Sequence, residues 1–258
     1  MILHIVNGAT VTEGLAATAV AGSVVEYSDV LHEGPVPPDV DAGAFEETRA
    51  RFLAACGWAT VDAARRHIAA WRDALAGNEW EEIVLWYEHD LFDQLNLVQV
   101  LPWIRERLPS EATVSLVCVG AFRHHPYFKG LGELAPDEIA ELFGGRERVR
   151  HAQYALAAHA WDAFRAPTPD ALDDLRHGDT EALPYLAPAV TRLLEEYPWT
   201  RDGLSRTERR FLSLVAAGPT SLATLFPHLT EPGDVLHVTD LLLADLAETL
   251  ARSSPALV

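Results

Sequence analysis

Short apolar runs in the first half of the chain are separated by polar loops and by segments of helical periodicity. The clearest run, Ile83–Tyr87, is unbroken and follows several acidic residues, which is typical of a strand buried on both faces of a parallel sheet. Three further runs have the length and composition of strands: Leu3–Val6, Ser23–Tyr27 and Thr113–Val119. This alternation of strands and helices predicts an α/β fold with a short parallel sheet and flanking helices, in a Rossmann-like three-layer arrangement.

Helical segments connect these strands. Phe45–Cys56 and Thr60–Ala76 predict two helices that form the crossover connection required between parallel strands. After Tyr87, apolar residues recur at helical spacing from Leu91 onward, and Asp90 is placed to cap that helix. We therefore expect a helix N-terminus directly after the most clearly predicted strand.

The second half of the chain has a different pattern. From about residue 136 to residue 197 only helical periodicity is found, and its last segment, Leu183–Tyr197, is interrupted by Pro188. The change in pattern predicts an α/β domain over residues 1–135 and a helical connector over residues 136–200.

A separate C-terminal module is predicted over residues 201–258. Ser205 followed by Glu208 matches a capping box at the start of a helix. A tight turn is expected at residues 218–220, before two more short helices. Three short helices with such a turn indicate a helix-turn-helix or winged-helix-like fold.

The charge of the chain narrows the expected partners. It carries 20 Lys and Arg against 38 Asp and Glu, a net charge of −18, which disfavours nucleic acid and anionic membranes over most of the surface. No apolar run approaches the roughly 18 residues of a membrane span. Cys56 and Cys118 lack metal-ligand spacing and are expected to be reduced thiols. These features predict a cytoplasmic protein of unknown oligomeric state.

Polar residues follow each of the four predicted strands. If the strands are parallel, these residues meet at the carboxyl edge of the sheet, where open α/β sheets bind their ligands. The candidates are Asn7 and Gly8 after the first strand, Asp29, His32 and Glu33 after the second, Glu88, His89 and Asp90 after the third, and Arg123, His124 and His125 after the fourth. Their convergence predicts a ligand crevice.

These residue types indicate acid–base chemistry on a polar, phosphorylated or nucleotide-like small molecule. His32 or His89 would transfer a proton, while Asp29, Glu33, Glu88 and Asp90 would orient the histidines or bind a metal. The expected ligand-binding residues are Asn7, Gly8, Arg123 and Gln94. Backbone N–H groups near Gly8 would hold an anion. A divalent metal ion would offset the acids, and a hydrolase or another phosphate-ester-processing enzyme is the reaction class expected.

Purely structural roles remain open for several of these residues. Asp90 caps a helix, Glu33 falls in a turn with Gly34, and a lone His89 is often a satisfied interior histidine. No metal-binding motif with close ligand spacing is present. Most tryptophans lie on predicted core stripes and are expected to pack in the interior.

A second hypothesis assigns the chain to another class, a ligand-responsive regulator. Its α/β domain would sense a metabolite, and residues 201–258 would bind DNA or a partner protein. Arg206, Arg209 and Arg210 are the candidate phosphate contacts, although nearby acids make the module acidic as a whole.

Several segments together resemble an uncharacterised bacterial family, the domain of unknown function 1835, paired with a C-terminal domain of unknown function 3658. The segments are HIVNG (4–8), DVLHEGPVP (29–37), LWYEHDLFDQLNL (85–97), FKGLGEL (128–134), AWDAFRAP (160–167) and GLSRTERRFL (203–212). The resemblance covers most of the chain and implies no particular reaction. Members of the family often carry an acid at the position of Ala9, so the resemblance implies that this chain lacks that group or replaces it.

Overall fold

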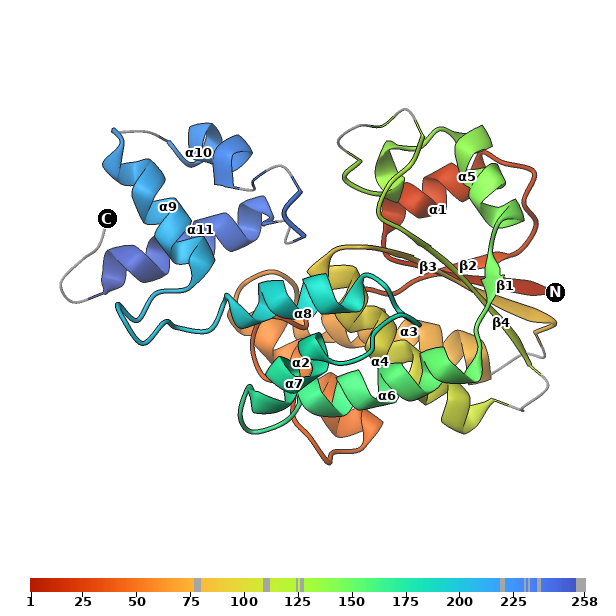
Figure 1. Ribbon diagram of the computed structural model, residues 1–258. Helices are drawn as coiled ribbons and strands as arrows, with labels where there is room; N and C mark the ends of the chain where they lie inside the picture. Colours follow the sequence, from red (N-terminus) through yellow and green to blue (C-terminus); the bar gives the residue numbers. More distant parts are fainter. Residues whose placement is uncertain are drawn as a thin grey trace.

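The computed structural model describes residues 1–76, 80–108, 112–123, 125, 128–218, 221–229, 231, 233–235 and 238–253. Over this part of the chain the strands form one five-stranded sheet, in the order β2-β1-β3-β4-β5 (Figure 1). The strands are β1 (Ile2–Val6), β2 (Ser23–Glu26), β3 (Glu82–Glu88), β4 (Thr113–Val119) and β5 (Glu147–Arg148). The first four are mutually parallel, as the sequence predicts, and β5 is antiparallel to β4.

Helices cover both faces of the sheet and complete a three-layer α/β fold (Figure 1). One face carries α1 (Ala9–Ala16), the short 3-10 helix η1 (Leu131–Glu133) and α5 (Pro136–Gly144), which pack with the side chains of Val84 and Trp86. The other face is covered by a larger set: α2 (Ala42–Ala55), α3 (Val61–Ala76), α4 (Leu91–Arg107), α6 (His151–Phe164), α7 (Asp170–His177) and α8 (Leu186–Leu194).

The central strand β3 explains why the sheet forms in this order. From Ile83 to Glu88 its residues are all buried, with Val84 and Trp86 facing one helical layer and Ile83, Leu85 and Tyr87 facing the other. A strand that is apolar on both faces is stable only between two helical layers. Its carboxyl end therefore lies where the polar residues of the predicted crevice begin.

The connector expected at residues 136–200 is part of this layered fold. The helix α5 packs on one face of the sheet, β5 extends its edge, and α6 to α8 pack on the other face. The strand β5 has only two residues, both charged and exposed, so no apolar pattern marked it. Pro188 does not interrupt a helix, because it lies in the first turn of α8, where the missing N–H has no intrahelical partner to lose.

The C-terminal module has its own small core. Helices α9 (Arg206–Ala216), α10 (Leu222–Leu229) and α11 (Asp240–Arg252) bury Phe211, Leu225, Leu229, Leu243 and Leu250 together. The predicted capping box is confirmed, because Ser205 accepts from the Glu208 N–H at 3.1 Å and the Glu208 carboxylate accepts from the Ser205 N–H at 2.7 Å. Pro219 and Thr220 of the predicted turn lie outside the described residues.

No helix in the described segments is both long enough and apolar enough to cross a membrane.

Candidate functional site

A buried cluster of acids and amides lies at the end of β3. The side-chain amide of Asn7 donates to Glu88 Oε1 at 3.1 Å and to Asp93 Oδ2 at 2.8 Å. Asp93 Oδ2 also accepts the backbone N–H of Glu88 at 2.5 Å. Both amide hydrogens of Asn7 are thus used to join the ends of β1 and β3. The role expected for Asn7 as a ligand contact stays a prediction and requires these bonds to break.

The Glu88 carboxylate and Gln94 hold the loops around this cluster. Glu88 Oε1 accepts the backbone N–H of Leu131 at 2.8 Å, and a Cβ on Gly130 would meet Glu88 Oε2 at 2.1 Å, so the loop approaches the carboxylate too closely for a larger residue. The Gln94 amide donates to the Glu88 carbonyl at 2.6 Å and to Cys118 Sγ at 3.4 Å. Gln94 therefore fixes the end of the strand, and the ligand-binding role expected for it stays a prediction.

Asp93, in the first turn of α4, belongs to the cluster although it was not among the predicted site residues. Burial, together with the negative charges of Asp90 and Glu88, raises the pKa of Asp93 well above its ordinary value. Burial disfavours the ionised form because the surrounding medium solvates charge poorly. The shift favours the protonated form of Asp93, which lowers the negative charge of the cluster.

Asp90 caps α4 as predicted. Its carboxylate accepts the backbone N–H of Asp93 at 2.8 Å. The next free N–H of this helix end, on Leu91, donates to the carbonyl of Val235 at 2.6 Å. A segment next to the C-terminal module thus closes on the helix that begins at the sheet edge, a contact between residues 144 positions apart that no local pattern announces.

His89 lies on the turn between β3 and α4. Its ring is 6.1 Å from the ring of Tyr185, with the planes at 68°. Gly120, at the end of β4, lies against both residues: a Cβ there would meet Tyr185 Cε1 at 2.6 Å and His89 Cβ at 2.9 Å. His89 therefore packs against Tyr185, the residue that precedes α8.

Asp29 has a partner that the sequence analysis missed. Arg49 of α2 donates to both carboxylate oxygens of Asp29 at 2.8 Å, and both side chains are fully buried. The Asp29 backbone N–H and carbonyl are bound by the Asn96 side chain at 2.8 and 3.0 Å. Bidentate arginine pairs of this kind are strong and geometrically specific. Asp29 consequently anchors the loop that carries His32, and the role expected for it in orienting a histidine stays a prediction.

His32 is a predicted site residue whose two ring nitrogens are both buried without a hydrogen bond among the described residues. Burial lowers the pKa of His32 to about 4, against the opposing effect of the carboxylates of Asp90 and Glu196. The ring, packed edge-on against Phe92 at 6.3 Å, is therefore neutral at physiological pH.

His32 and Glu33 form one wall of a cavity of about 310 Å³, and the C-terminal module forms much of the rest. Burial, reinforced by the charges of Glu196 and Asp245, raises the pKa of Glu33 to about 7, although the residue keeps an exposed surface. The remaining polar lining residues are Glu196, Ser205, Thr207, Glu208, Asp245 and Thr249. The cavity is acidic, and its acids come from both parts of the chain.

Gly8 and Arg123 lie apart from this cavity. Gly8 precedes α1 in extended backbone, and no heavy atom beyond its neighbours lies within 4 Å of a Cβ built there, so the expected anion position is open. Arg123 forms an ion pair with Glu141 of α5 and stacks on Phe122. His125 faces Glu138 at 3.4 Å, and His124 lies outside the described residues.

The structure gives the expected metal no support. In the part of the chain that is described, no group of three or more His, Cys, Asp or Glu side chains is arranged to hold a metal ion. At the sheet edge, Glu88, Asp90 and Asp93 accept hydrogen bonds from the Asn7 amide or from backbone N–H groups, and Asp29 pairs with Arg49.

The three arginines considered as phosphate contacts are engaged within the protein. Arg206 lies 2.6 Å from the carboxylate of Glu195. Arg209 lies 2.9 Å from the carboxylate of Asp202 and stacks on Trp199. Arg210 donates to a backbone carbonyl at 3.1 Å and has Glu231 as its acidic partner. A nucleic acid would have to displace these carboxylates, which weakens the DNA-binding hypothesis.

Comparison of the chain with protein-family models, with curated proteins and with solved structures found no match. The resemblance to the two domains of unknown function therefore stays a prediction.

Proposed function

We propose that this protein binds a small polar molecule at the carboxyl edge of its sheet, in the cavity that His32 and Glu33 share with the C-terminal module. The observation that supports this most is the pair of shielded, unpartnered ring nitrogens of His32 at the wall of that cavity. A buried polar group without a partner costs about 1–3 kcal/mol. A ligand that reached the ring after a small rotation would recover that energy.

The acids around the cavity select the chemistry of the ligand. The cavity is lined by four acids: Glu33, Glu196, Glu208 and Asp245. These acids repel a bare phosphate and favour amino, ammonium or hydroxyl groups, which donate hydrogen bonds. The phosphorylated or nucleotide-like ligand expected from the sequence is the narrower proposal. It requires a cation to accompany the phosphate.

His32 and Glu33 are also suited to proton transfer. The pKa of His32 is lowered by burial to about 4 and the pKa of Glu33 is raised by burial to about 7. Two neighbouring groups whose pKa values are displaced in opposite directions can act as base and acid at neutral pH. This pair supports the enzyme class of function, with His32 accepting a proton and Glu33 donating one.

A ligand-responsive regulator is the second candidate, and a specific feature favours it. The cavity wall is formed by the α/β fold on one side and by residues of α9 and α11 on the other. A ligand there would change how tightly the module is held, because it contacts both parts. Since the arginines of α9 are internally paired, the output of such a regulator would be a protein contact and not DNA binding.

Thermal-shift titration tests the proposal. Spermidine, glucosamine and glucose 6-phosphate with and without Mg²⁺ are added to the unaltered protein, to His32→Ala and to His159→Ala. His159 is exposed on α6 and serves as the matched control. A ligand at a hundred times its dissociation constant adds about 2.7 kcal/mol, or a rise of roughly 5 °C or more in Tm for a chain of this size.

We expect one of the amines or sugars to raise the Tm of the unaltered protein and of His159→Ala but not of His32→Ala. An equal rise in all three proteins would place the ligand elsewhere and contradict the proposal. A rise with glucose 6-phosphate only in the presence of Mg²⁺ would support the narrower, phosphate-binding form.

A further inference from the structure

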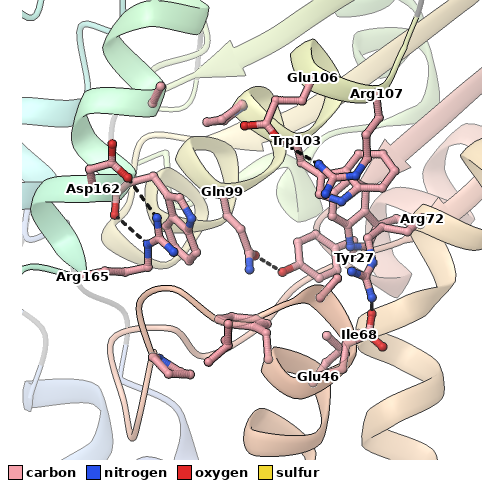
Figure 2. A pocket seen from close by; sticks show the side chains of 18 residues that line it. Tyr27, Glu46, Ile68, Arg72, Gln99, Trp103, Glu106, Arg107, Asp162 and Arg165 are labelled. Atoms are coloured by element: carbon pink, nitrogen blue, oxygen red, sulfur yellow. Dashed lines mark hydrogen bonds and ion pairs between the residues drawn. The ribbon is translucent and has the colours of Figure 1, made fainter.

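A second cavity lies among the helices that cover one face of the sheet. It has a volume of about 280 Å³ and is bounded by α2, α3, α4, α6 and the segment before α2 (Figure 2). No described residue lines both this cavity and the one beside His32. Pockets for drug-sized ligands measure about 300–1,000 Å³, so this cavity suits a molecule of one or two rings.

Aromatic side chains form much of its wall. Trp71 and Trp103 meet edge to face at 4.8 Å, Tyr27 lies 5.1 Å from Trp71, and Phe45 meets Trp161 edge to face at 6.1 Å. The sequence analysis assigned the tryptophans to packing, yet Trp103 and Trp161 remain partly exposed at the cavity. Aromatic walls favour planar ring systems, because offset and edge contacts add to the hydrophobic gain.

The charged residues at this cavity are paired with one another. Arg165 and Asp162 lie 2.9 Å apart, as do Arg107 and Glu106, and Arg72 pairs with Glu46. Figure 2 shows these three pairs around the rim. Three cations and three anions cancel, so the cavity offers no net charge to a strongly charged ligand. A neutral occupant fits best.

Gln99 supplies a directional hydrogen-bonding group at the cavity. Its Oε1 accepts the hydroxyl of Tyr27, and Figure 2 shows the amide between Tyr27 on one side and the pair of Arg165 and Asp162 on the other. Burial raises the pKa of Tyr27 well above its ordinary value, so the hydroxyl stays protonated and remains a donor. With its oxygen taken, Gln99 presents an NH₂ group that has no partner in the described chain.

The geometry points to a binding site for a neutral, planar nitrogen heteroaromatic molecule, the size of a nucleobase, whose acceptor atom receives a hydrogen bond from the Gln99 amide. Ring nitrogens and carbonyl oxygens of such molecules are acceptors, and their faces pack on indole and phenol rings. The site is distinct from the proposed crevice at His32 and does not depend on it.

Isothermal titration of the full chain with adenine, uracil and nicotinamide tests this inference. The variants are Gln99→Glu, which keeps an oxygen for the Tyr27 hydroxyl but removes the amide donor, and Trp161→Leu, which removes one wall. Trp199→Leu is the matched control, because Trp199 is 44 % exposed and lies outside the cavity. His32→Ala distinguishes this site from the carboxyl edge.

We expect at least one of the three probes to bind the unaltered protein with a Kd below about 1 mM, which is a binding free energy of about −4 kcal/mol. Binding should weaken about tenfold in Gln99→Glu and in Trp161→Leu, and stay unchanged in Trp199→Leu and His32→Ala. Absence of binding by all three probes would overturn the inference. So would binding that is lost in His32→Ala and retained in Gln99→Glu.

Discussion

Arg192 of α8 and Asp234, in the segment before α11, form an ion pair in which Nε and Oδ1 are 2.8 Å apart and each side chain is 5 % exposed. Arg192 also contacts Glu196 and donates to the Thr207 hydroxyl at 2.9 Å. Thr207 belongs to the first turn of α9. One arginine of the layered fold thus binds two segments of the C-terminal module, the first turn of α9 and the segment before α11, and this contact lies beside the cavity of His32.

Replacing Arg192 should release the module. Arg192→Met removes the guanidinium that lies 2.8 Å from the buried Asp234 carboxylate, whereas Arg206 lies farther away, at 3.5 Å, so we expect a loss of about 3 kcal/mol in the free energy of unfolding. Urea titration measures the loss, and hydrogen exchange shows whether α9 to α11 lose protection first. Arg176→Met, which removes an exposed pair with Asp173, should cost less than about 1 kcal/mol. Equal costs in the two variants would show that the buried pair is not what holds the module.

Arg49→Met should be more damaging than any exposed arginine substitution. It leaves the buried carboxylate of Asp29 unpaired and removes donors to the carbonyls of Val30 and Glu33. The expected loss is about 3–5 kcal/mol, measured by urea unfolding. The double variant Arg49→Met with Asp29→Leu should recover part of that loss, because no buried charge remains. If the double variant is no more stable than Arg49→Met alone, the unpaired Asp29 carboxylate is not the cause of the stability loss.

His32 should make stability fall in mildly acidic solution. Its pKa is about 4 in the folded protein because of burial, against an ordinary value of 6.5, so the unfolded chain binds a proton that the folded one excludes. The stability associated with neutral His32 is fully present above about pH 6.5 and is lost as the pH falls toward 4, by about 3 kcal/mol in total. Unfolding free energies of the unaltered protein and of His32→Gln, compared between pH 7 and pH 4.5, measure this. If His32→Gln loses as much unfolding free energy between pH 7 and pH 4.5 as the unaltered protein does, His32 is not the cause of the loss.

Glu33 should make stability fall as the pH rises, which is opposite to the effect of His32. Burial and the neighbouring carboxylates raise its pKa to about 7, so the folded chain holds a proton that the unfolded chain releases above pH 4.5. The stability that this group contributes is present at low pH and is lost as the pH rises through 7. Glu33→Gln should therefore raise Tm more at pH 8 than at pH 5. A larger effect at pH 5 would contradict the raised pKa.

Asp93 provides a matched comparison within the buried cluster. Burial raises the pKa of Asp93 and so favours its protonated, neutral form, and Asp93→Asn replaces the side chain with a neutral group of similar shape. Asp93→Ala instead leaves the Glu88 N–H and the Asn7 amide without their acceptor. We expect a change below about 1 kcal/mol for the first variant and a loss of about 2–5 kcal/mol for the second. Thermal unfolding at pH 7 compares them, and similar losses would mean that Asp93 is ionised.

Local patterns in the sequence predicted the elements and their arrangement in a parallel sheet. The run Ile83–Tyr87 and the cap at Asp90 depend on residues that are neighbours in the chain, and both are confirmed. Burial on both faces of a strand and capping of a helix leave short-range signatures, because periodicity and hydrogen bonds to the first turn act over a few residues. The placement of polar residues at one sheet edge follows from these elements.

Only the tertiary structure decided which of those polar residues is free to act. From the sequence, Asp29 could equally have been an acid that orients a histidine. In the fold it is paired with Arg49 of the neighbouring helix α2. Conversely, nothing in the sequence distinguishes Asp245 from an ordinary surface acid, whereas in the fold α11 places it at the cavity of His32. A buried charge takes whatever partner the packing of distant segments supplies, and that packing depends on contacts between residues far apart in the chain. For this reason the sequence predicts where a site lies, whereas the fold determines which side chains remain available in it.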